Sequence, residues 1–68
     1  MDAVDILKHL KYARVIKAYA EQTGKNYREA MDFFFKSLTF KLLEDGIADM
    51  HCRSDLYLVD ELIIEEKH

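Results

Sequence analysis

Three adjacent phenylalanines, Phe33, Phe34 and Phe35, constrain the fold of this 68-residue chain more than any other feature. On a helix, successive side chains point about 100° apart, so three neighbouring rings cannot share one face. A chain of this length forms one domain, near the lower size limit for independent folding. The run therefore raises the question of what covers each of the three rings.

Composition narrows the classes of protein to which the chain can belong. Half of its residues are apolar, and Cys52 is its single cysteine, without the spacing of a zinc site. A lone thiol is typical of a reducing compartment. The sequence contains no apolar run of 18 residues, and its first residues carry acids where a signal peptide carries Lys or Arg. We therefore expect a single domain, residues 1–68, in the cytoplasm and not in a membrane.

Charge is divided unevenly along the chain. The net charge is −3, made up of +3 in residues 1–41 (eight Lys/Arg, five Asp/Glu) and −6 in residues 42–68 (two Lys/Arg, eight Asp/Glu). Nucleic-acid binding needs a dense basic stripe. The basic residues of the first half step around the helix instead: Lys8, Lys11, Arg14 and Lys17. This division predicts basic helices packed beside an acidic one, with nucleic-acid contact as the weaker interpretation.

The first expected helix covers residues 3–22, which are rich in helix formers. Asp2 is a candidate N-cap, and Gly24 lies just past the end. One apolar stripe consists of Ile6, Leu10, Ala13 and Ala20. Other apolar residues lie mostly outside that stripe: Tyr12, Val15, Ile16 and Tyr19. We therefore expect this helix to be apolar on more than one side.

The second expected helix covers residues 27–37. Asn26 and Glu29 have the spacing of a capping box at its start. The apolar stripe then consists of Tyr27, Ala30, Met31, Phe34, Phe35 and Leu38. Phe34 lies near the middle of this stripe and Phe35 at its edge, whereas Phe33 falls roughly opposite. An ordinary core therefore explains two of the three phenylalanines and leaves Phe33 without cover.

The third expected helix covers residues 40–51, with Thr39 as its N-cap. Its stripe runs through Gly46 and consists of Phe40, Leu43, Ile47 and Met50. The alternative makes the sequence "EDG" a turn that ends the helix. We favour the continuous helix because the apolar period resumes in phase after the glycine.

The last expected helix covers residues 55–66, with Ser54 as its N-cap. Its main stripe consists of Leu56, Val59, Leu62 and Ile63, and Tyr57 and Ile64 form a second one. A strand is the alternative, but the segment lacks a turn signal and clean alternation. The predicted fold class is therefore all-α: a compact bundle of about four short helices.

The segment "MHCRSDLYLVDEL", residues 50–62, resembles a known family pattern, Leu-His-Thr-x-Gly-x-x-Tyr-Ile-Val-Asp-Asp-Ile. The pattern marks the short bacterial proteins called domain of unknown function 3791. The identical positions are His51, Tyr57, Val59 and Asp60, and the similar ones are Leu58, Glu61 and Leu62. Upstream, "AYAEQTGKNYREAMDFFFK" is also similar to the family. The chain departs from the pattern at Cys52, Arg53 and Ser54, where the family has Thr-x-Gly. The family has no established chemistry.

No group of residues indicates catalysis. Asp49, His51 and Cys52 are the nearest to a reactive cluster, but neighbours in sequence point apart and offer no metal-ligand spacing. We therefore expect no enzyme activity, catalytic residue, metal or cofactor. His51 at the end of a helix, together with Ser54, is interpreted as a structural turn. A contact role for His51 is the alternative.

The resemblance implies a small partner or antitoxin role, because family members are often encoded beside ADP-ribosyltransferase-like proteins. The sequence predicts a non-enzymatic protein–protein interaction module, and a small DNA-binding regulator is the alternative. The first and last helices carry apolar residues on a second side that one core cannot bury. This predicts a homodimer that covers three candidate residues: Phe33, Tyr57 and Ile64. A different protein partner is the alternative cover for them.

Overall fold

The computed structural model describes residues 3–46 and 53–67 of the chain, with side chains from residue 6 onward. This part of the chain folds into helices α1 (Ala3–Thr23), α2 (Tyr27–Lys36), α3 (Leu38–Asp45) and α4 (Asp55–Glu66). The predicted all-α bundle is therefore confirmed for the described residues.

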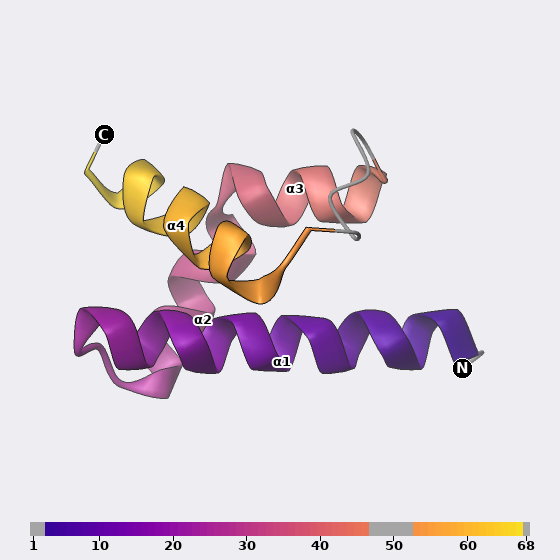
Figure 1. The fold of residues 1–68 in the computed structure, drawn as a ribbon, viewed down its shortest axis with the longest axis horizontal. Helices are drawn as coiled ribbons and strands as arrows, with labels where there is room; N and C mark the ends of the chain where they lie inside the picture. The colour runs from indigo at the N-terminus through magenta and orange to yellow at the C-terminus, as the bar shows by residue number, and fades with distance from the viewer. Residues whose placement is uncertain (1–2, 47–52, 68) are drawn as a thin grey trace.

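The long helix α1 forms one side of the molecule, and the shorter helices pack against it and one another (Figure 1). Helices α2 and α4 pack closely on α1, and α3 packs mainly on α2 and α4. The core lies where these helices meet. Its buried side chains are Tyr12, Val15, Ile16, Tyr19, Ala20, Ala30, Phe34, Leu43, Leu58, Val59 and Leu62.

Helix α2 begins at the predicted capping box. The Glu29 backbone N–H donates to Asn26 Oδ1 at 2.8 Å, and the Asn26 N–H donates to Glu29 Oε1 at 3.4 Å. The next helix begins earlier than predicted, because Ser37 is the N-cap of α3 and not Thr39. Ser37 has an extended backbone, and its hydroxyl accepts from the Phe40 N–H at 3.0 Å. The expected start of the third helix at residue 40 is therefore wrong by two residues.

Gly46 ends α3, so the prediction of a helix through this residue is wrong. Its φ of +67° lies in the left-handed region, and its N–H bonds back to the carbonyls of Leu42 and Leu43. A Cβ would cost roughly 1 kcal/mol in this conformation, which explains why a glycine is placed here. The alternative interpretation of "EDG" as a turn is correct. The rest of the expected helix, residues 47–51, lies outside the described residues.

The buried faces of α1 and α4 match their predicted stripes only in part. Of the predicted α1 stripe, Ala20 is buried, but Ile6, Leu10 and Ala13 are exposed; the other buried residues of α1 lie outside that stripe. On α4 the predicted core residues Val59 and Leu62 are buried, but Leu56 is exposed and Leu58, which lay outside the stripe, is buried. Because α1 and α3 both pack on α4, the centre of its buried face is set by Leu58 and Leu62.

The structure accounts for the phenylalanine run differently from the prediction. Phe34 is fully buried, as expected. Phe33 packs against the core and stacks on Tyr19 of α1, with ring centroids 5.6 Å apart and planes at 21°. The expectation that Phe33 lacks cover is therefore wrong. The ring that is left half exposed is Phe35, at 46%. The stripe of α2 alone could not reveal a second aromatic neighbour on α1.

Candidate interaction surfaces

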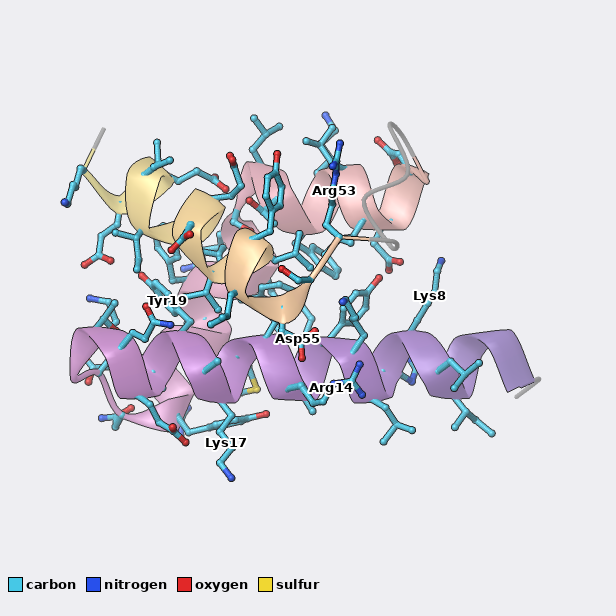
Figure 2. The ribbon with its side chains drawn as sticks, viewed as in Figure 1. Lys8, Arg14, Lys17, Tyr19, Arg53 and Asp55 are labelled. Atoms are coloured by element: carbon cyan, nitrogen blue, oxygen red, sulfur yellow. The ribbon has the colours of Figure 1, made fainter. Side chains whose placement is uncertain are left out.

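Polar bonds fix both ends of α4 against α1. At its start, Asp55 binds Lys11 Nζ at 2.8 Å and Arg14 Nε at 3.1 Å; Figure 2 shows Asp55 directly beside Arg14. At its end, Glu66 accepts from the Tyr19 hydroxyl at 2.8 Å and pairs with Lys25 at 3.0 Å. We call this contact the α1–α4 seam. It holds α4 in one orientation and so fixes what the helix presents to solvent.

These bonds shift the pKa values of the groups that make them. The hydrogen bond from Lys11, reinforced by Arg14, lowers the pKa of Asp55. The hydrogen bond from Tyr19, followed by that from Lys25, lowers the pKa of Glu66. Burial raises the pKa of the Tyr19 hydroxyl far above its ordinary value, and the bond to Glu66 adds to this. The seam therefore favours the ionised form of the carboxylate at each end of α4.

Carboxylates also fix both ends of α3. Glu65 of α4 accepts from the backbone N–H groups of Leu38 and Thr39 at 2.7 and 3.0 Å, where a helix N-terminus favours negative charge. At the other end, Glu44 accepts from the Tyr12 hydroxyl at 2.8 Å and pairs with Lys8 at 3.5 Å. Bases of α1 thus meet acids of α3 and α4, as the division of charge predicted.

The first candidate surface is the α4 outer face, which consists of Leu56, Tyr57, Asp60, Glu61 and Ile64. Its three apolar side chains are all exposed, and the Arg53 guanidinium lies 5.1 Å from the centre of the Tyr57 ring. The predicted interface residues Tyr57 and Ile64 therefore lie on one surface of one helix. The Ser54 hydroxyl accepts from the Tyr57 N–H at 3.1 Å, so Ser54 is the predicted N-cap. His51 lies outside the described residues.

The second candidate surface is the α1/α2 face, which consists of Ile6, His9, Leu10, Ala13, Tyr27, Met31 and Phe35. Between the two helices lies an open, largely apolar hollow of about 170 Å³, which most of these residues line. Ile6 and Leu10 extend the apolar surface along α1 beyond the hollow. The sequence analysis identified the apolar stripe of α1, but it assigned Tyr27 and Phe35 to the core. The sequence held one indication of an exposed face: the predicted first helix is longer than the second, which cannot cover its whole length.

Some kinds of site receive no support from the described residues. Among them, no three side chains of His, Cys, Asp or Glu gather where they could hold a metal ion. The cluster Asp49, His51 and Cys52 lies outside the described residues. None of the described helices combines the length and the apolar character needed to cross a membrane.

Comparisons with known proteins do not assign the chain to a family. A scan against protein-family models gave no match, and searches of curated proteins and of solved structures gave none either. The resemblance to domain of unknown function 3791 therefore stays a prediction, and the surfaces themselves carry the functional argument.

Proposed function

We propose that the chain is a small cytoplasmic protein–protein interaction module without enzymatic activity, which binds a second protein through the α4 outer face. The observation that carries the proposal is a row of exposed apolar side chains between carboxylates on a helix that is fixed at both ends. Interfaces are enriched in aromatic residues at their centre and are polar at their rim. Tyr57 and Ile64 supply the apolar part of this face, and Asp60 and Glu61 supply the rim.

The α1–α4 seam supports this proposal because it prepares the face before a partner arrives. Binding is weakened when side chains and helices must first be ordered. Here Asp55 and Glu66 anchor the two ends of α4, so the spacing of Tyr57 and Ile64 is set in the free protein. The partner that fits is an apolar groove edged by basic groups.

The identity of the partner is proposed from the sequence resemblance. Family members are often encoded beside ADP-ribosyltransferase-like proteins, so an adaptor or antitoxin-like role toward such a neighbour is our leading form of the proposal. Inhibition of the neighbour would then follow from occupation of its surface by the α4 outer face, without any chemistry by this chain.

Observed ion pairs favour this proposal over the DNA-binding alternative. Four basic residues of the first half already pair with acids of this chain: Lys8, Lys11, Arg14 and Lys25. Phosphates would have to compete with those acids. DNA binding would fall steeply between about 50 and 200 mM salt. A labelled duplex in a fluorescence anisotropy titration should show no such salt-steep binding.

The decisive experiment is co-expression with the protein encoded beside this one, followed by titration calorimetry of the purified pair. We expect binding by the parent and a loss of at least about tenfold in affinity for Ile64→Lys, because a charge enters the apolar centre of the face. Leu10→Lys is the matched control, since Leu10 is 52% exposed and Ile64 is 50% exposed on different helices. Equal binding by the parent and Ile64→Lys would contradict the proposal.

A further inference from the structure

We propose that the α1/α2 face binds a second copy of this chain through a two-fold symmetric contact. This inference goes beyond the proposed function, because it uses a different face and a different partner. It also relocates the expected homodimer. Phe33 was one of three predicted contact residues, with Tyr57 and Ile64, but it stacks on Tyr19 within one chain. Phe35, Tyr27, Leu10 and Ile6 are the large apolar side chains exposed on this side.

The area of the α1/α2 face is sufficient for a small specific dimer. Its four large apolar side chains are 46–52% exposed, and His9 and Ala13 are exposed as well, so the face leaves on the order of 600 Å² in contact with water. The largest apolar patch on a typical monomer is about 300–600 Å², and such patches are often functional. Two copies face to face would bury about 1,200 Å² in total, which is the lower end for a specific interface.

The unequal lengths of α1 and α2 give this face a shape that a second copy can fill. Helix α1 has 21 residues, or about 30 Å, whereas α2 has 10 residues, or about 15 Å. Phe35 near the end of α2 and His9 on α1 both line the hollow, so Ile6, almost one turn before His9 and exposed, lies beyond it and marks a step. A two-fold axis near this step sets the first half of α1 of one copy beside that of the other.

Charge separates a second copy from other occupants of the face. The exposed charged residues that continue its two rows are Lys17 and Glu21 on α1, and Arg28 and Asp32 on α2. These four charges sum to zero, and the bases in the first half of α1, Lys8, Lys11 and Arg14, pair with acids of their own chain, so charge does not oppose contact between two copies. Lys17 points away from α4, on the open side of α1 (Figure 2). The α4 outer face carries Asp60 and Glu61 instead, so self-contact there would set like charges against each other.

Closure also favours the two-fold arrangement. A contact between two different faces of the same protein extends into rings or filaments, whereas one face against itself stops at two chains. Pairing the α1/α2 face with itself leaves both α4 outer faces free in the dimer. The two proposals are therefore compatible, and each can fail without the other.

Sedimentation equilibrium of the purified chain over a range of concentrations tests the inference. We expect a mass that rises toward twice the 8.0 kDa of one chain and no further. Leu10→Lys and Tyr27→Lys, one on each helix, should each raise the dimer Kd by about tenfold or more. Ile64→Lys, with similar exposure, should leave the dimer Kd within about twofold. Circular dichroism confirms that each variant stays helical.

A second measurement does not depend on any variant. On dilution of the labelled parent, the NMR signals of Ala13 and Met31 should shift, and those of Leu56 and Asp60 should stay in place. A monomeric parent at every concentration would overturn the inference, as would growth beyond two chains. Loss of the dimer in Ile64→Lys but not in Leu10→Lys would also overturn it. None of these outcomes affects binding of the neighbour-encoded protein, which reports on the proposed function alone.

Discussion

Two helices pack on α1 in different ways. The α1–α4 seam is closed by polar bonds at both ends of α4, around apolar side chains that are fully buried. The α1/α2 face has a capped turn at one end and an open hollow along its outer side. The two sides of one helix thus differ, because the α4 side is closed by polar bonds whereas the α2 side leaves apolar surface exposed.

The difference also explains how so small a domain can expose apolar residues and still fold. A domain of this size buries only about 60% of the surface that its unfolded chain exposes, so each buried contact matters. The carboxylates that fix α3 and α4 come from the acidic half of the sequence, and three of the four bind groups on α1 or the loop that follows it. These polar bonds therefore help to stabilise the fold, although part of the α1/α2 face is exposed to solvent.

The largest expected effect in this comparison comes from shortening one apolar side chain on each side. Leu62→Ala on α4 should lower the free energy of unfolding by about 2–5 kcal/mol, because Leu62 is fully buried and a cavity remains. Met31→Ala on the α1/α2 face should cost only about 1 kcal/mol, since Met31 is partly exposed. Urea denaturation at low protein concentration measures both. Equal losses would show that the two sides do not differ in stability.

A smaller effect should distinguish the two outer members of the phenylalanine run. Phe33→Ala should cost about 2 kcal/mol, because it removes the ring stacked on Tyr19. Phe35→Ala should cost about 1 kcal/mol, since half of that ring is already in water. The positions are neighbours on one helix and receive the same residue, so helix propensity cancels. Dilute samples in urea avoid any contribution from a dimer, and a larger loss at Phe35 would reverse the assignment.

Local signals in the sequence predicted a large part of this fold. Capping residues identified the starts of α2 and α4, because Asn26, Glu29 and Ser54 act within one turn of their own helix. The position of Gly46 was visible, but its role was not. An apolar period in phase on both sides of a glycine does not show whether the backbone between them is left-handed.

The faces of the helices could not be predicted as well, because they depend on neighbours far along the chain. Phe33 is covered by Tyr19, and Leu58 is buried where α1 and α3 meet α4. Each stripe was read on one helix at a time, and two helices were apolar on more than one side. Tyr57 and Ile64, which were predicted as interface residues, are exposed on the side of α4 opposite its buried face, and their contact with a partner stays a prediction.

The smallest expected effect concerns the pH dependence of the seam. The pKa of Asp55 is lower in the folded chain than its ordinary value of 3.8, so the unfolded chain binds a proton more readily. The stability that Asp55 contributes is therefore complete above its unfolded pKa and is lost as the pH falls through its folded pKa.

Because Asp55 is partly exposed, that contribution is about 0.5–1 kcal/mol at neutral pH. Asp55→Asn should lose this amount at pH 7 and converge with the parent as the pH falls through the lowered folded pKa of Asp55. Asp60→Asn on the solvent side of α4 should follow the parent throughout, and urea denaturation over this pH range distinguishes them. If Asp55→Asn and Asp60→Asn behaved alike, the bonds to Lys11 and Arg14 would not stabilise the seam, and the contrast between the two sides of α1 would rest on apolar packing alone.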